Sequence, residues 1–219
     1  NPTLTENDPM YKTRLTGLGS PDLVQAMLDG NWDIVAGAAF EKLSRSTHQI
    51  RQFTPLPHWA RWTSIDWGTA KPYAVGWFCV PDEDVVLAAK NGHAEKIIPK
   101  NSIIMYREMY GWNGKPDEGM RKEATEVADL LKARIGSRRL AYISADPSMW
   151  KVDGGPSQAE TMIKHGVTMR RADNSRNPGL EEVRSRIAGN ERGPMLFVFL
   201  SCHDGFWRTM PDLVMDEHT

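Results

Sequence analysis

The spacing of hydrophobic positions changes near residue 60 of this chain. Residues 1–57 alternate short apolar patches with Pro and Gly breaks, a pattern that favours an arm of short helices over a folded sheet. Apolar runs of strand length then follow at 62–66, 73–80 and 103–110. The polar, Gly-containing stretch 81–100 is expected to be a surface loop. We therefore predict three consecutive strands in an antiparallel meander.

Helices and two more strands follow the meander. Apolar residues at i, i+3 and i+4 spacing predict an amphipathic helix that ends at Gly136. A capping-box sequence at 157–160 predicts a second helix, and the apolar positions over 180–187 predict a third. Short apolar runs at 140–144 and 195–200 predict strands, the later one buried on both faces. The residues that carry the first helix are Ala124, Val127, Ala128, Leu131 and Ile135.

The order of these elements indicates the fold class. Three strands, a helix, a strand, two helices, a strand and a final helix predict an α/β fold, with a mixed central β-sheet flanked by helices. Residues 53–59 hold two prolines and two aromatic side chains, a composition typical of a stiff connector. We place the domain boundary there, with an N-terminal arm over 1–57 and one α/β domain over 58–219.

Charge, apolar runs and cysteine spacing indicate which kinds of partner and which cellular compartment suit the chain. The 27 basic and 28 acidic residues balance to a formal net charge of −1, so binding to a polyanion would depend on local basic patches. No run reaches the roughly 18–20 apolar residues of a membrane helix, so no membrane contact is expected. Cys79 and Cys202 lack CxxC or Cys/His ligand spacing, which favours reduced thiols in a cytosolic protein over a structural zinc site.

Two aspartates stand at the ends of predicted strands. Asp66 closes the run 62–66, and Asp146 follows the run 140–144 just before a proline. Ligands bind beyond the carboxyl ends of strands in open α/β sheets, so these two carboxylates are expected to converge. Converging carboxylates repel unless they share a cation, and their oxygens select Mg²⁺ or Mn²⁺, which in pairs activate water for phosphodiester cleavage. Alternatively, each aspartate only begins a turn.

Seven short motifs occur in order over most of the chain. They are GNWD (30–33), GAAF (37–40), SIDWG (64–68), YGW (110–112), ADP (145–147), RADNSR (171–176) and FWRTMP (206–211). Their order and spacing resemble the C-terminal nuclease domain of the large terminase subunit of tailed bacteriophages. The resemblance covers residues 30–219 and implies a ribonuclease-H-like fold.

This resemblance also implies an activity and its partners. It implies a metal-dependent endonuclease that cuts concatemeric double-stranded DNA during phage genome packaging, with two Mg²⁺ or Mn²⁺ ions in the active complex. Asp66 and Asp146 match the two family aspartates that bind these catalytic metals. The implied partners are the ATPase domain of the same subunit, the small terminase subunit and the portal, in the host bacterial cytoplasm. The arm 1–57 is expected to come from the end of that ATPase domain.

The chain departs from the family pattern near its end. The third metal carboxylate of the family comes from a helix after the motif at 206–211, and Thr219 precedes any such motif. The resemblance therefore implies a C-terminal end that is cut short, with Asp216 as a substitute third ligand. No GxxxxGK[ST] loop occurs, so the chain is not expected to translocate DNA by itself.

Positive side chains for DNA gather in two places. Lys71 closely follows the first aspartate and is a candidate for contact with a phosphate near the metals, although a solvated hairpin lysine has the same signature. Lys164, Arg170, Arg171 and Arg176 surround a Gly/Asn/Pro-rich stretch that can track a DNA backbone without reading its sequence. The alternative for this group is a solvated surface face. The tryptophans are too scattered for a base-stacking platform and are expected to be packing residues.

Two other classes of function remain open from the sequence. Residues 66–69 (DWGT) also resemble the first phosphate loop of actin-like ATPases and sugar kinases, with 153–155 (DGG) as a candidate second loop. That second loop should link two strands, whereas 153–155 runs into a capping-box sequence. A non-catalytic DNA-docking module with vestigial acids is the third interpretation. Cleavage of plasmid DNA with Mn²⁺ separates the three.

Overall fold

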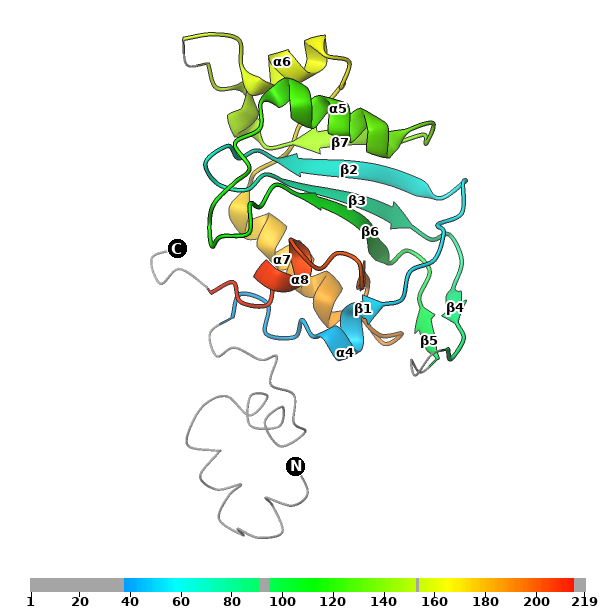
Figure 1. The fold of residues 1–219 in the computed structure, drawn as a ribbon. Coiled ribbons are helices and arrows are strands. Elements are labelled where there is room, and N and C mark those ends of the chain that lie inside the picture. The colour runs from blue at the N-terminus through cyan, green and yellow to red at the C-terminus, as the bar shows by residue number, and fades with distance from the viewer. Residues whose placement is uncertain (1–37, 91–94, 153, 215–219) are drawn as a thin grey trace, which may run out of the picture.

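The structure is a computed structural model that describes residues 38–90, 95–152 and 154–214. Its centre is a seven-stranded sheet in the order β1-β9-β6-β3-β2-β7-β8 (Figure 1). Within this sheet only β3 runs against the others, because its two pairings are antiparallel and the remaining ones are parallel. The strands are β1 (Gln49–Ile50), β2 (Ala60–Asp66), β3 (Ala74–Val80), β6 (Ile103–Tyr110), β7 (Tyr142–Ala145), β8 (Arg170–Arg171) and β9 (Leu196–Phe199).

The three strands predicted first form the meander that the sequence indicated. β2 pairs with β3 along its whole length, from Ala60 opposite Val80 to Asp66 opposite Ala74. β3 pairs in turn with β6, with one irregularity between Trp77 and Phe78. The predicted mixed α/β sheet is therefore confirmed, and all four residues of β9 are buried, as its continuous apolar run predicted.

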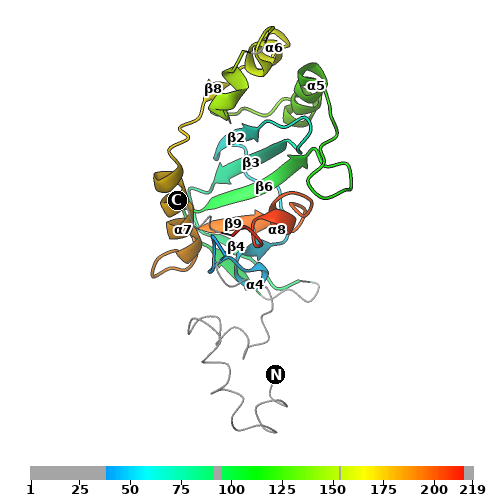
Figure 2. The same cartoon turned by 90° about the vertical axis from the view of Figure 1, so that its left-hand side faces the viewer.

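Helices lie on both sides of the sheet. Figure 2 shows α5 on one side of the central strands and α7 on the other. The predicted apolar face of α5 is buried: Val127, Ala128 and Leu131 are each 0% exposed. The helices are α4 (Arg45–His48), α5 (Ala124–Ile135), the 3-10 helix η1 (Pro147–Trp150), α6 (Gln158–Lys164), α7 (Arg176–Ala188) and α8 (Phe206–Thr209).

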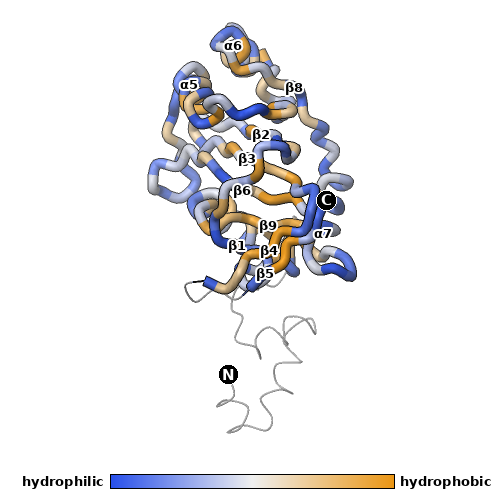
Figure 3. The backbone as a smooth tube through the Cα atoms, turned by 90° about the vertical axis from the view of Figure 1, so that its right-hand side faces the viewer, coloured by the Kyte–Doolittle hydropathy of each residue, from blue (hydrophilic) through white to orange (hydrophobic). Residues whose placement is uncertain are grey.

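One expectation about the loops is wrong. The stretch 81–100 was expected to be a surface loop, but it contains β4 (Val85–Leu87) and β5 (Lys96–Ile98), which pair as a separate antiparallel sheet. Strands of three residues offer too few positions for a periodic signal. In Figure 3 the hydropathy of this small sheet continues the hydrophobic region around β9.

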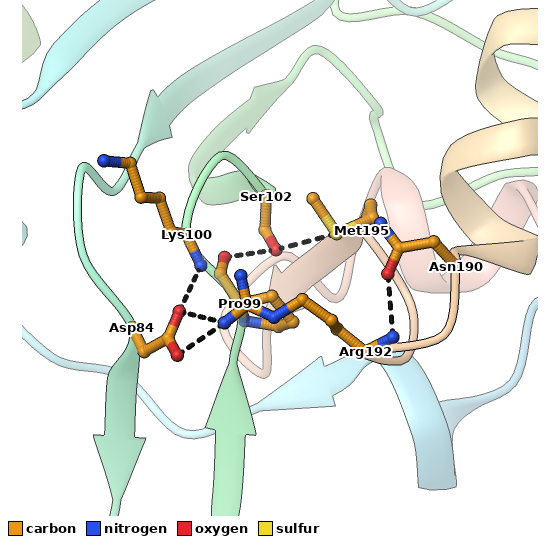
Figure 4. Close-up of polar contacts among 7 residues, drawn as sticks. All are labelled: Asp84, Pro99, Lys100, Ser102, Asn190, Arg192 and Met195. Carbon is orange, nitrogen blue, oxygen red and sulfur yellow. Dashed lines mark hydrogen bonds and ion pairs between the residues drawn. The ribbon is translucent and has the colours of Figure 1, made fainter.

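Polar contacts tie the small sheet to the loop before β9. The Arg192 guanidinium donates to both carboxylate oxygens of Asp84, at 2.6 and 2.5 Å, and the Lys100 N–H donates to the same group (Figure 4). The Lys100 N–H, followed by Arg192, lowers the pKa of Asp84. These contacts lie at the edge of the main sheet where β6 and β9 begin. The β4–β5 sheet is therefore held at the edge opposite to the one where β6 and β9 end.

Part of the predicted arm packs into the core of the domain. Phe40, Leu43 and Ile50 are buried, and β1 joins the sheet beside β9. Residues 1–37 lie outside the described residues. The boundary at residue 57 and the origin of the arm in an ATPase domain therefore stay predictions.

The two cysteines lie inside the domain. Cys79 and Cys202 are free and buried, and burial raises the pKa of each thiol to about 12. In the part of the chain that the structure describes, no helix combines the length and apolar character needed to cross a bilayer.

Candidate active site

The carboxyl ends of β2 and β7 lie side by side at one edge of the sheet. The two strands are parallel neighbours, with Ile65 opposite Ala145. The Asp146 N–H donates to the Ile65 carbonyl at 3.0 Å, which continues the pairing to the next residues, Asp66 and Asp146. The edge lies on the left of Figure 1 and faces the viewer in Figure 2. The two aspartates that end predicted strands thus stand on neighbouring strands at the same level.

The pleat and a tight turn direct these aspartates. Ile65 is 1% exposed and Ala145 0% exposed, so alternation along the strands places the following aspartates on the opposite face of the sheet. The chain then turns at Gly68, where an added Cβ would lie 2.4 Å from the Lys71 carbonyl oxygen. A side chain does not fit in that turn, so glycine is required directly after the segment that carries Asp66.

The electrostatics of the pair are those of two carboxylates near each other. Asp66 is an exposed residue, but the surrounding protein partly desolvates its carboxylate. This desolvation is the main cause of the raised pKa of Asp66. Repulsion from Asp146 raises the pKa of Asp66 further, while the Trp67 N–H lowers it. The repulsion follows from the same placement of the two carboxylates on neighbouring strand ends.

Asp146 also performs the turn role that the sequence left open as an alternative. Its Oδ1 accepts a hydrogen bond from the Ser148 N–H at 2.7 Å and so caps η1, which has Pro147 at its start. This bond uses one carboxylate oxygen. The second oxygen stays available, so capping and metal binding are compatible at this residue.

The donor set fits a hard divalent cation. Asp66 and Asp146 offer carboxylate oxygens, the ligands that Mg²⁺ and Mn²⁺ prefer. A shared cation would relieve the repulsion between the two carboxylates, which adds to the effect of desolvation on the pKa of Asp66. Across 38–90, 95–152 and 154–214, no cluster of three His, Cys, Asp or Glu side chains is arranged to hold a metal. Asp216, the expected substitute ligand, lies outside the described residues.

The structure places two of the five predicted DNA-binding residues beside Asp146. Arg170 and Arg171 form β8, which pairs with β7 so that Ser144 is opposite Arg170 and Ala145 is opposite Arg171. Both arginines are exposed, and they adjoin the strand end that carries Asp146.

The other three predicted DNA-binding residues lie apart from Arg170 and Arg171. Lys71 is in the turn after Asp66, where its Nζ forms an ion pair with Asp117 at 2.8 Å between two well-exposed side chains. Lys164 ends α6 and Arg176 begins α7, so both lie on helices and not on the strand edge.

Glu108 is a residue of this region that the sequence analysis missed. It lies on β6 opposite Gly76 and accepts hydrogen bonds from the N–H groups of Gly205 and Phe206, both at 2.9 Å. These bonds fix the start of α8 against the sheet. An acidic residue within the largely apolar strand 103–110, next to Arg107, was the sequence signal for it.

The segment proposed as a second phosphate loop leads into a helix. Ser157 accepts from the Glu160 N–H, and Glu160 accepts from the Ser157 N–H, which completes the predicted capping box of α6. Asp153 lies outside the described residues. Because Gly155 is followed by a capped helix and not by a strand, the geometry differs from that expected of the ATP-binding alternative.

The fold is similar to that of solved phage terminase structures. The large terminase from the thermophilic bacteriophage D6E matches with a TM-score of 0.57 and 18% identity, over 83% of this chain and 38% of that protein. Its complex with ADP matches with a TM-score of 0.58 and 18% identity, over 96% and 45%. The P22 large terminase nuclease domain matches with a TM-score of 0.53 and 15% identity, over 76% and 74%. No protein-family model and no curated protein matches the chain.

The matched regions cover only part of the D6E terminase. This chain spans 38% of the D6E terminase in one match and 74% of the P22 nuclease domain, so the likeness concerns a domain and not a whole motor. The chain has the fold of phage large-terminase nuclease domains, the ribonuclease-H-like mixed α/β fold that the sequence resemblance predicted.

Proposed function

We propose that this chain is a metal-dependent endonuclease domain of a phage DNA-packaging machine. The observation that carries the proposal is the placement of Asp66 and Asp146 at the ends of two neighbouring parallel strands, on a fold shared with terminase nuclease domains. Its substrate is concatemeric double-stranded DNA, and its reaction is phosphodiester hydrolysis.

Asp66 and Asp146 are the residues that would hold Mg²⁺ or Mn²⁺. Bound divalent ions at such a site lower the pKa of the attacking water and stabilise the charge that develops on the phosphate. The role of the chain is to hold the two carboxylates close together on the ends of neighbouring strands. The Ser148 N–H orients Asp146, and the turn at Gly68 fixes the backbone after Asp66.

DNA is held by positive side chains around this pair. Arg170 and Arg171 are placed beside Asp146 on β8 and would contact the phosphate backbone without reading bases. Lys71, Lys164 and Arg176 are proposed as further contacts, with Lys71 first having to leave Asp117. Because such exposed ion pairs are weak, exchange of that partner for a phosphate is inexpensive.

Partners and location follow from the resemblance. We propose that the domain works beside the ATPase domain of the same subunit, with the small terminase subunit and the portal, in the cytoplasm of the host bacterium. A third metal ligand, with Asp216 as the candidate in this chain, completes the site in the assembled protein.

Cleavage of supercoiled plasmid DNA in Mn²⁺ or Mg²⁺ tests the proposal. Asp66→Asn and Asp146→Asn should each lower the cleavage rate by about 100-fold or more, the scale of losing one electrostatic stabiliser from an active site. Asp82→Asn is the matched control, because Asp82 follows β3 at the opposite edge of the sheet. Circular dichroism establishes that the variants are folded.

Two outcomes would overturn this function. If the wild-type chain leaves plasmid intact with either metal, the chain is not a nuclease by itself. If it cuts and both Asp66→Asn and Asp146→Asn cut equally well, the site is elsewhere.

A further inference from the structure

Three arginines, two on β8 and one on α8, rest on aromatic rings. The guanidinium carbon of Arg170 lies 3.4 Å from the ring centroid of Tyr142, and that of Arg171 lies 5.2 Å from Trp150. The guanidinium carbon of Arg208, on α8, lies 3.9 Å from Trp112 and 5.3 Å from Tyr110. A guanidinium within about 6 Å of a ring centroid is attracted to the face of the ring. The rings that the three arginines contact are Tyr142, Trp150, Trp112 and Tyr110.

These arginines are not neutralised by acids. Within the described part of the chain, none of the three forms an ion pair with a carboxylate, whereas Arg192 pairs with Asp84. Arg208 donates through Nε to the Asp204 carbonyl, which leaves its terminal nitrogens free of that bond. Because a guanidinium carries five N–H donors, most donors of this group remain for a ligand. The positive charge of the three arginines and most N–H donors of Arg208 are thus not taken up by carboxylates of the described residues.

Arg170 and Arg171 lie on one side of the aspartate pair. Trp150 closes the helix that Asp146 caps, so Arg171 is the nearer of the two to the aspartates. Tyr142 is the first residue of β7, opposite Trp62, so the Arg170 guanidinium reaches back toward the start of that strand. The Tyr142 ring is itself held, because it stacks on Trp62 at a centroid distance of 6.2 Å, and Trp62 stacks on Phe78 at 5.4 Å. The ring below Arg170 is therefore the end of a continuous stack across three strands.

Arg208 lies on the other side of the pair. Tyr110 is the last residue of β6 and is opposite Ala74, which is itself opposite Asp66. The sheet order β6-β3-β2-β7-β8 puts the two carboxylate-bearing strands between β6 and β8. At about 4.8 Å between neighbouring strands, β6 and β8 are roughly 19 Å apart. The strands β6 and β8, beside which these arginines lie, thus flank the two aspartate-bearing strands.

We propose that Arg208 is a further DNA phosphate-binding residue, paired across the active site with Arg171, with Arg170 as a contact farther along β7, and that the rings beneath these arginines are positioning residues. The proposal rests on the proposed nuclease function and names how its substrate is held. A DNA backbone would cross the strand edge from Arg208, past Asp66 and Asp146, to β8. A planar guanidinium already stacked on a ring loses less freedom on binding phosphate than a free one.

Salt-dependent DNA binding tests the role of Arg208. A fluorescent DNA duplex is titrated with the full chain in EDTA, so that binding is measured without cleavage, at several salt concentrations. Each phosphate contact contributes about 0.9 to the slope of log K against log salt concentration. Arg208→Ala should lower that slope by about 0.9 and weaken binding several-fold at low salt. Arg139→Ala is the control, because Arg139 is an exposed arginine just before β7, at the opposite edge of the sheet.

Variants that keep the charge test the rings. Arg208→Lys and Tyr142→Leu retain every positive charge but remove stacking, so they should weaken binding about threefold or more with the salt slope unchanged. Arg208→Gln keeps a polar side chain with N–H donors and removes the charge, which guards against a folding defect in Arg208→Ala.

The results separate failure of this inference from failure of the proposed function. If the wild type binds DNA and both Arg208→Ala and Arg208→Gln match Arg139→Ala in affinity and slope, the phosphate role of Arg208 is refuted while the nuclease proposal stands. If Tyr142→Leu binds like the wild type, the positioning role of that ring is refuted. A wild-type chain that does not bind DNA at any salt concentration overturns both this inference and the proposed function. Tight binding of acidic polypeptide with no binding of DNA would have the same consequence.

Discussion

Gly119 is the residue at which one added methyl group should disturb both stability and the candidate site. It lies where the loop after β6 crosses the turn between β2 and β3, and its N–H donates to the Ala70 carbonyl at 2.7 Å. A Cβ at this position would lie 2.3 Å from the Lys71 carbonyl oxygen and 2.5 Å from that of Thr69. Ordinary contacts begin at 3.4 Å, so Gly119→Ala must separate the two segments by about 1 Å.

The size of the effect follows from this displacement. Overpacking of this kind costs about 1–3 kcal/mol, because backbone atoms and not a flexible side chain must move. For a chain of this length the melting temperature falls by about 2–4 °C for each kcal/mol, so a decrease of about 2–12 °C is expected. The displaced turn directly follows Asp66. A misplacement of about 1 Å in a catalytic geometry lowers the reaction rate by up to about 100-fold.

Thermal unfolding and plasmid cleavage measure the two consequences of Gly119→Ala. Gly179→Ala is the matched control, because an added Cβ in that part of α7 meets nothing within 4 Å. It should raise the free energy of unfolding by about 0.5–1 kcal/mol, since alanine is the better helix former. If Gly119→Ala melts at the wild-type temperature, the crossing of the loop and the turn is not as close as described, and the reasoning is refuted.

Three further substitutions test the core and the aspartate pair. Asp66→Asn should raise the melting temperature of the metal-free chain at neutral pH, because burial and Asp146 raise the pKa of Asp66 and its ionisation therefore opposes folding. That advantage should disappear as the pH falls below 3.8, the usual pKa of the group, where the carboxyl is protonated in both states; equal melting temperatures from pH 7 to 3.5 would contradict the pairing. Thr63→Val should stabilise the fold by about 1 kcal/mol in urea unfolding, because the buried Thr63 hydroxyl has no hydrogen-bond partner among the described residues; a destabilised variant would contradict this. Leu131→Ala, at a position that is 0% exposed, should cost about 2–5 kcal/mol in the same assay, and a loss below 1 kcal/mol would mean that α5 is not packed as described.

Local sequence patterns determined most of the secondary structure. The strand runs of β2, β3 and β6 and the apolar face of α5 are properties of consecutive residues, so their periodicity predicts them. The capping box of α6 is equally local, because its two partners are three residues apart. The position of Asp66 and Asp146 at strand ends was also readable, since each directly follows an apolar run.

Tertiary structure alone decided the elements that depend on distant partners. β1 and β8 have two residues each and exist only because β9 and β7 offer pairing edges, so no periodic pattern precedes them. The β4–β5 pair was hidden for the same reason, and its anchor joins Asp84 to Arg192 across more than a hundred residues. The positions where strands end were thus predictable from the sequence pattern, but the strand that each one pairs with was not.

The same distinction holds for the candidate site. The sequence identified the two aspartates and the basic residues of β8 as separate features, because charge and strand ends are visible residue by residue. It did not reveal that Arg208 stacks on Trp112, because that contact joins segments 96 positions apart that meet only when β9 pairs beside β6. Which chemical groups are present is decided by the sequence, whereas which groups face one another is decided by the order of strands in the sheet.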